Sequence, residues 1–436
     1  MRRGFGFYIV AITFCTVMAL YHEVGAAQTI SATAEVSNPA QLPEEDSAEA
    51  SQLSALIREA EAGNSMAQFK LGKSYAHGYV VAMDYSEAVK WWSRAAQQGL
   101  ARAQNELGYS YLHGHGVSQD LSQAFHWLQA AAKQGLAAAQ YNLANMYERG
   151  EYVSQDFKQA AELYSKAADQ GLAAAQNNLA LLYAQGWGVP RDYSRYFQLL
   201  RAAAEHGEPG AQHNLGRAYL EGKGVARDPK QAIMWFQKAA SRGLSASCYA
   251  IGYLQENGNG VRRNYGEALE MYRKAAEAGL PAAEDALGRM FLDGRGVTQD
   301  HIQAAQWFRR SAEQGDPIGE TALGVAYFKG QGLNKDYRQA AEWFRKAAEK
   351  GLAVAQANLG YMFETGLGAS IDYPEAYKWY SLGAEGGNPE AKRAREKLVQ
   401  ILTKNQVAEG QLRASTWLQQ HWETTASTYI ADDFKR

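Results

Sequence analysis

Apolar residues return along this chain with a period of 36 residues. The period is marked by a glycine that recurs without insertion or deletion, at 63, 99, 135, 171, 207, 243, 279, 315, 351 and 387. We number each repeat from this glycine as position 0, and the first nine glycines open nine repeats. Self-similarity of this length is the signature of a repeat architecture. Within the period the apolar residues lie three or four apart, which indicates helices rather than strands.

The first half of each repeat predicts a helix, here named helix A. Positions 4, 8 and 12 share one helical face. Position 8 is aliphatic in all nine repeats and position 12 is aromatic in eight, with Gln255 the exception. Position 9 is Gly or Ala, which lets a neighbouring helix approach closely. Gly at position 15 in every repeat suits the left-handed residue that ends a helix.

The second half predicts helix B. Asp at position 21, replaced once by Asn264, suits the N-cap, and Glu or Gln three residues later gives capping-box spacing, with Arg195 the one departure. Six of the ten tryptophans fall at position 28, where they share an apolar face with position 29 and with the small residues at 32 and 33. We therefore interpret the Trp series as core and the Asp series as helix caps, not as catalytic carboxylates. Proline at position 2 of four units fits the first turn of a helix.

Such a helix pair cannot bury its apolar face alone, so neighbouring repeats must stack. The sequence therefore predicts an all-α, αα solenoid of nine 36-residue repeats over residues 64–387. A capping helix is expected over 51–63, a half-repeat with a closing helix over 388–425, and a tail over 426–436.

One run carries a family resemblance. Ala103, Leu107-Gly108, Tyr111, Gly114, Gly116-Val117, Asp120, Ala124, Trp127 and Ala131-Ala132 together resemble the Sel1-like repeat, a relative of the tetratricopeptide repeat. The resemblance implies a right-handed αα superhelix that holds protein partners in a concave groove. It also implies a role in exported bacterial proteins that assemble envelope machinery or contact a host. Some exported members carry a cysteine pair in each repeat and are linked to β-lactam or cell-wall ligands, and this chain lacks those cysteines.

The N-terminal segment has the layout of a secretory signal peptide. Arg2 and Arg3 precede an uncharged, mostly apolar run over residues 5–20, and small residues follow up to Ala26 and Ala27. We expect cleavage of residues 1–26, a disordered tether over 27–50, and a periplasmic or secreted protein. The alternative is an uncleaved segment that anchors the chain to the membrane.

Charge and cysteine content narrow the function classes. The 436 residues carry a formal net charge of −2, so no bulk attraction to nucleic acid is expected. The mature chain would keep one cysteine, Cys248, which we interpret as a partly buried, inert thiol. His77, His113 and His115 fall on adjacent loops and could in principle share a metal, but we interpret them as surface histidines. We therefore predict no cofactor, no metal and no nucleic-acid partner.

Helix A also carries residues that the repeat does not dictate. Positions 6 and 10 lie roughly opposite the core residue at position 8, and by the family resemblance this face lines the groove. Aromatic side chains, Asn and Arg are the composition expected of a protein-binding surface. The alternative is that these aromatic side chains only pad neighbouring helices. The candidate groove residues are Phe69, Lys73, Asn105, Tyr109, Tyr141, Asn145, Asn177, His213, Arg217, Tyr249, Tyr253, Arg289 and Tyr361.

Two functions follow from these patterns. The first is a monomeric, non-catalytic exported scaffold that binds a protein or peptide partner in this groove. The alternative, from the family resemblance, is an enzyme or binder that acts on peptidoglycan or β-lactams. Trp187, in a loop position that is mostly polar elsewhere, is either an exposed contact or packs against its own repeat.

Overall fold

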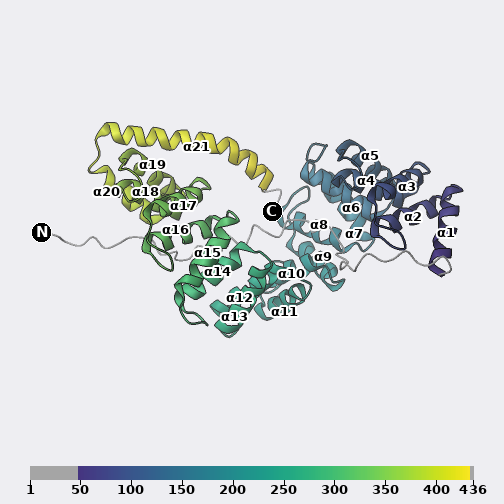
Figure 1. Cartoon of the computed structure of the whole chain (residues 1–436), viewed down its shortest axis with the longest axis horizontal. Coiled ribbons are helices and arrows are strands. Elements are labelled where there is room, and N and C mark those ends of the chain that lie inside the picture. The colour runs from purple at the N-terminus through teal and green to yellow at the C-terminus, as the bar shows by residue number, and fades with distance from the viewer. Residues whose placement is uncertain (1–47, 433–436) are drawn as a thin grey trace. The chain divides into compact units, whose positions relative to one another are not determined.

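A computed structural model describes residues 48–432, which form 21 helices and, within that range, no strand (Figure 1). The expected signal peptide and most of the expected tether lie outside the described residues. The chain divides into two compact units, residues 28–235 and residues 236–436, and the boundary falls inside helix α11. Each unit is described by itself.

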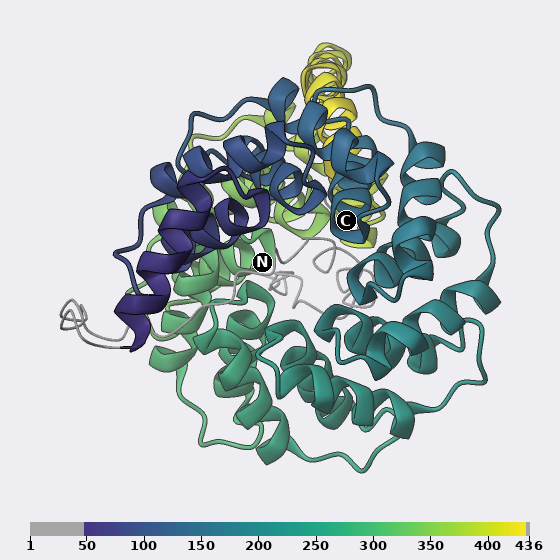
Figure 2. The same cartoon turned by 90° about the vertical axis from the view of Figure 1, so that its right-hand side faces the viewer.

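The N-terminal unit contains repeats one to four and most of repeat five. Helix α1 begins at Ala48, inside the segment expected to be tether, and takes the place of a helix B before the first repeat. Successive A and B helices pack side by side in chain order (Figure 2). The helices are α1 (Ala48–Glu61), α2 (Ser65–His77), α3 (Tyr85–Gln97), α4 (Ala101–His113), α5 (Leu121–Lys133), α6 (Ala137–Arg149), α7 (Phe157–Asp169), α8 (Ala173–Gln185), α9 (Tyr193–Glu205), α10 (Pro209–Glu221) and the start of α11 (Pro229–Ala240).

The C-terminal unit repeats the arrangement and ends in a long helix. Helix α21 packs against α19 and runs on past the boundary expected at 425, to Asp432. The helices are α12 (Ser245–Asn257), α13 (Tyr265–Glu277), α14 (Pro281–Asp293), α15 (His301–Glu313), α16 (Pro317–Lys329), α17 (Tyr337–Glu349), α18 (Ala353–Thr365), α19 (Tyr373–Glu385), α20 (Pro389–Val399) and α21 (Lys404–Asp432).

Glycines end the helices as predicted. The glycine at position 15 is left-handed after each helix A, for example Gly330 at φ +72°. The glycine at position 17 has a second role, because it lies against the start of the preceding helix B. A Cβ added at Gly332 would lie 1.9 Å from the carbonyl oxygen of His301. This loop therefore joins neighbouring repeats as well as the two helices of its own repeat.

The N-caps of helix B are confirmed, but the reciprocal half of the predicted capping box does not form. Asp120 accepts hydrogen bonds from the backbone N–H groups of Ser122 and Gln123 at 2.9 and 3.0 Å. The N–H of Asp120 itself donates to the carbonyl of Tyr111 at 3.0 Å, and the same bond recurs in every repeat. Because that donor is already satisfied by helix A, the Gln or Glu at position 24 has no N–H left to accept from. This explains why Arg195 is tolerated there.

Two-sided capping does occur at α21. The hydroxyl of Thr403 accepts from the N–H of Gln406 at 3.3 Å, and the side-chain oxygen of Gln406 accepts from the N–H of Thr403 at 3.0 Å. Further along, Arg413 pairs with Asp372 at 2.8 Å, and Trp417 meets Trp379 edge-on. The predicted closing helix is therefore held by its own cap and by contacts with α19.

A ladder of buried amides links neighbouring repeats, and the sequence interpretation missed it. Gln104, at position 5, donates to the carbonyl of Ala96 in the preceding repeat at 3.2 Å. Its side-chain oxygen accepts from Gln134, at position 35, at 2.8 Å. The pairs Gln68–Gln98 and Gln140–Gln170 repeat this bond, and Glu284–Gln314 and Glu320–Lys350 replace it with a charged equivalent.

The ladder breaks in repeat four, and the break predicts a stabilising substitution. Position 35 is His206, and the buried oxygen of Gln176 has no partner among the described residues. His206→Gln should raise the free energy of unfolding by about 1 kcal/mol, because it supplies the missing donor. The new Gln could also keep the bond that His206 makes to Ala202, as Gln170 does to Lys166. Urea unfolding of both proteins measures the change. The reverse substitution, Gln170→His, should lower the free energy of unfolding by a similar amount. Equal stability of the wild type and both variants would show that the ladder does not stabilise the fold.

Candidate partner-binding surface

The A helices form the inner layer of each unit. Successive A helices contact one another, as α4 does with α6, α8 with α10, α14 with α16, and α18 with α20. Among the described helices of the nine repeats no pair of successive B helices makes contacts as extensive, and only the closing helix α21 packs closely on a helix B, α19. In a stacked array the layer whose helices approach more closely is the shorter one, so each unit curves toward its A helices. The candidate residues on helix A therefore belong to the inner layer of helices.

The residues at position 6 are mostly buried, although the sequence interpretation placed them on the surface of the groove. Eight of the nine residues there are less than about a tenth exposed, including Phe69 at 8%, His213 at 4% and Tyr249 at 7%. The two asparagines are bonded to the next repeat: Asn142 donates to Asn105 at 3.1 Å, and Asn214 donates to Asn177 at 3.0 Å. Helix A has another helix A on each side, so a residue opposite the core is still covered. Position 6 thus holds the inner layer together.

Position 10 is the more accessible row. Lys73 is exposed, and the other members are half-buried: Tyr109, Asn145, Leu181, Arg217, Tyr253, Arg289, Val325 and Tyr361. Some are held by their own helix, as Arg217 is by Glu221 at 3.4 Å. Tyr141, at position 6, is the half-buried exception in its row, and its ring packs near Tyr164 at 5.8 Å between centroids. The accessible part of the candidate surface is therefore the position-10 row together with its immediate neighbours.

The first two repeats carry an aromatic and imidazole cluster beside this row. The rings of Tyr109 and His113 are 4.3 Å apart, and those of His113 and His115 are 5.7 Å apart. Burial and the adjacent His115 lower the pKa of His113. His77 packs on Tyr79 instead, at 5.4 Å. No group of three His, Cys, Asp or Glu side chains within the described range is arranged to hold a metal ion.

Repeats three, six and nine share a carboxylate that the sequence interpretation missed. Position 29 is Tyr and position 13 is Glu in these repeats alone, and both positions are apolar in the other six. The phenol of Tyr272 donates to Glu256 at 2.8 Å, that of Tyr380 donates to Glu364 at 2.5 Å, and that of Tyr164 donates to Glu148. The joint occurrence of two chemically complementary residues, 16 positions apart, is a signal that comparison of the repeats could have found.

The densest polar cluster lies in the C-terminal unit, between α12 and α14. Asp285 is 2% exposed, and its Oδ2 accepts from the guanidinium of Arg289. Its other oxygen, Oδ1, has no partner among the described residues. In repeats two and four the equivalent oxygen accepts from an Asn at position 7 of the next repeat, but that position is Ala322 here. The cluster therefore contains a buried carboxylate that is only half satisfied.

Burial dominates the electrostatics of this cluster. It raises the pKa of Asp285 to about 6, while Arg289 opposes the shift and Asp316 and Glu256 add to it. Burial also raises the pKa of Tyr249 to about 12, against the effect of Arg289. Glu256 is held at both oxygens, by Tyr272 and by Arg295 at 3.1 Å. At neutral pH Asp285 is thus ionised, and Asp285 and Glu256 each face an arginine.

Cys248 and Trp187, which the sequence interpretation also named, have structural roles. Cys248 is 8% exposed, and burial raises the pKa of its thiol, which makes it less reactive. Trp187, in the loop of repeat four, packs on Phe157 at 5.0 Å between ring centroids, and this ring contact is with the preceding repeat, not with its own. This favours packing over an exposed contact.

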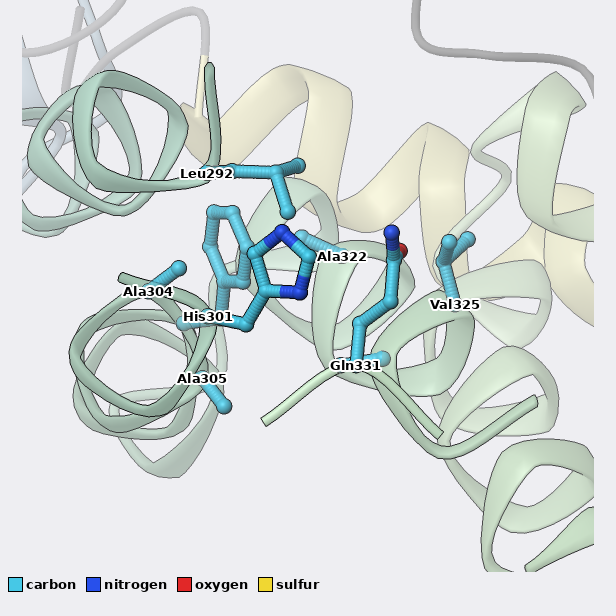
Figure 3. Close-up of a pocket in the computed structure, with 9 residues that line it drawn as sticks. Leu292, His301, Ala304, Ala305, Ala322, Val325 and Gln331 are labelled. Atoms are coloured by element: carbon cyan, nitrogen blue, oxygen red, sulfur yellow. The ribbon is translucent and has the colours of Figure 1, made fainter. Parts of the chain in front are cut away.

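A small cavity opens between α14, α15 and α16 (Figure 3). It measures about 20 Å³ and is lined by apolar residues such as Ala305 and Val325, with the imidazole of His301 and the amide of Gln331 beside it. Position 26 is Phe or Leu in several other repeats, so the alanine accounts for the space. A cavity of this size has room for a water molecule, whereas ligand pockets typically span ~300–1,000 Å³.

The described helices were also checked against the dimensions of a bilayer. None of them combines the length and the apolar character that crossing a membrane would require.

Comparison with known proteins gives a single family. The Sel1 repeat model matches nine consecutive segments, from 65–100 to 353–388. A solved structure described as a protective antigen of uropathogenic Escherichia coli with an SLR fold is 32% identical, with a TM-score of 0.50 over 84% of this chain and 86% of that one. A Sel1 repeat protein from Oxalobacter formigenes is 28% identical, with a TM-score of 0.53 over 84% and 98%. No curated protein matches the chain.

These matches agree with the geometry of the described residues. The matched segments begin two residues after the recurring glycine, and each contains one A helix and one B helix. The fold is typical of protein-interaction scaffolds. The chain belongs to the Sel1-repeat family.

Proposed function

We propose that this protein is a non-catalytic, exported scaffold that binds a protein or peptide partner along the inner helix-A face. The observation that carries the proposal is the position-10 row. Its side chains are at least partly accessible, and they differ from repeat to repeat. Aromatic residues and arginine on an inner face are the side chains that most often carry binding energy at protein interfaces.

Export rests on the N-terminal segment. Residues 1–26 have the composition of a cleaved signal peptide, and a single cysteine in the remaining chain suits a protein stabilised by packing alone. The Escherichia coli relative is a protective antigen, and we extend to this chain a location outside the cytoplasm. Periplasmic and secreted forms both fit this proposal.

A capture experiment tests the inner face. Tyr109→Ala, Tyr253→Ala and Tyr361→Ala combined should reduce partner recovery at least about tenfold, since interface aromatic residues commonly contribute 2 kcal/mol or more. These side chains are half-buried, so the fold should tolerate the change. The exported protein, tagged and crosslinked in its native cell, is captured and its partners are quantified by mass spectrometry.

The control variant also removes tyrosines, but it removes two that lie in loops rather than on the inner face. Tyr79 and Tyr152 are 63% and 56% exposed and lie in loops. Tyr79→Ala with Tyr152→Ala should leave recovery unchanged. Equal recovery from the inner-face variant and the wild type would remove the groove assignment.

A further inference from the structure

The cluster around Arg289 has more donors than acceptors. Only Nη1 of its guanidinium is bonded, to Asp285, which leaves Nε and Nη2 without an acceptor among the described residues. The hydroxyls of Tyr249 and Tyr253, on the preceding helix A, also find no acceptor in the described chain. Hydroxyl and guanidinium donors are normally paired when they lie in a partly buried place. Four donor groups on one stretch of inner face are therefore available to a ligand.

Three of the four carboxylate oxygens of Glu256 and Asp285 are already used. Glu256 accepts from Tyr272 with one oxygen and from Arg295 with the other, at 2.8 and 3.1 Å. Asp285 gives Oδ2 to Arg289, and its Oδ1 is fully enclosed. A ligand would supply the acceptor that these donors lack among the described residues.

The side chains that carry these donors are also accessible enough to contact an acceptor on a ligand. The Arg289 side chain is 26% exposed, and Tyr253 is half-buried. Tyr249 is 7% exposed, but its hydroxyl is not among the fully enclosed unpaired atoms of the described residues. The rings of Tyr249 and Tyr272 lie 5.5 Å apart, which fixes the direction of the Tyr249 phenol. The donors are thus held in place before a ligand arrives.

We propose that Arg289, Tyr249 and Tyr253 form a binding site for a carboxylate group of the protein partner. The inference rests on the proposed function and names the chemistry recognised at one point of the inner face. A guanidinium matches the two oxygens of a carboxylate, and the phenols add donors on the side of the preceding repeat. Asp285 and Glu256 neutralise the two arginines, so the site favours a singly charged acceptor over a phosphate with two charges.

The test uses short peptides on the full chain. Acetyl-Ala-Ala-Ala carries a terminal carboxylate, acetyl-Ala-Glu-Ala-amide carries a side-chain carboxylate, and acetyl-Ala-Ala-Ala-amide carries neither. We expect saturable binding of at least one carboxylate peptide at pH 7.5 in an NMR titration of arginine side-chain N–H signals, and no saturable binding of the amide. The peptide that binds identifies the source of the carboxylate.

Conservative variants separate binding from folding. Tyr249→Phe with Tyr253→Phe removes two donors and keeps both rings, so the fold should persist and the dissociation constant should rise about tenfold. Arg201→Gln is the control, because Arg201 lies on α9, a helix B outside the position-10 row, and is paired with Glu205. It should bind as the wild type does.

Three results would overturn the site: no carboxylate peptide saturates, the amide binds equally well, or the double Phe variant keeps full affinity. These outcomes are separable from failure of the proposed function. If partner capture depends on the inner face but no carboxylate peptide binds, the scaffold proposal stands and this site does not. If peptides bind as expected but capture is unaffected by the inner-face variant, the site stands and the scaffold proposal does not.

Discussion

Gly332→Ala should lower the free energy of unfolding of the C-terminal unit by ~2–5 kcal/mol. Gly332 has φ +73°, and a left-handed conformation costs an L-residue roughly 1–2 kcal/mol. The new Cβ would also lie 1.9 Å from the carbonyl oxygen of His301, and forced overpacking typically costs about 1–3 kcal/mol more. The carbonyl belongs to the start of α15, so the strain falls on the junction between two repeats.

A matched variant separates the cost of the left-handed backbone conformation from the cost of the close approach. Gly351 has φ +86°, and an added Cβ there would meet nothing within 4 Å. Gly351→Ala should therefore cost only the ~1–2 kcal/mol of the backbone conformation. Repeat arrays can unfold in parts, so urea unfolding should be combined with hydrogen exchange of the amides in α15 and α16. If both variants lost the same free energy of unfolding, the close approach of Gly332 to the carbonyl of His301 would contribute nothing.

Two repeats carry a residue other than glycine at position 17, and they show how the requirement for glycine can be relaxed. Val80 and Tyr152 occupy position 17 of repeats one and three, with φ of +65° and +68°, and they are the non-glycine residues with positive φ among those described. Repeat one has only α1 before it, which reduces what its loop must pack against. In repeat three the Tyr152 ring gains a contact with Phe125, at 5.6 Å. The sequence pattern alone marks such positions as departures but does not say what compensates for them.

The fold was predictable because its signals are local and repeated. The helix bounds follow from residues such as Gly330 and Asp120, which act on their own helix ends. The Sel1 assignment and the solenoid are confirmed for the same reason. The ladder between Gln104 and Gln134 joins residues 30 apart, and it was missed because each Gln was considered in its own helix.

The candidate surface was less predictable, because burial depends on a neighbouring repeat. His213 lies opposite the core face of its own helix and is nevertheless 4% exposed. A helical wheel describes one helix, whereas the inner layer buries both flanks of each A helix. The position-10 residues, one turn further along, keep their accessibility, and whether a partner uses them is a proposal that the capture experiment addresses.

Arg289→Gln should destabilise the C-terminal unit by ~3–5 kcal/mol at pH 7.5, since removing one member of a buried ion pair leaves the other charge uncompensated. The loss should shrink at lower pH. The pKa of Asp285 is raised from 3.8 to about 6 in the folded chain, so its contribution to stability is present at low pH and is lost as the pH rises through about 6. Without Arg289, burial and the effects of Asp316 and Glu256 remain, and all three raise this pKa.

Urea unfolding at pH 5 and pH 7.5 measures this difference. The gap between wild type and Arg289→Gln should be small at pH 5, where Asp285 is largely protonated in the variant, and large at pH 7.5. The double variant Asp285→Asn with Arg289→Gln removes both charges and should return to within about 1–2 kcal/mol of the wild type, because a buried pair contributes little net stability. A loss that is the same at both pH values, or that the second substitution does not restore, would mean that the carboxylate is not the group left unpaired. In that case the half-satisfied Asp285 could not be what orients Arg289 on the inner face.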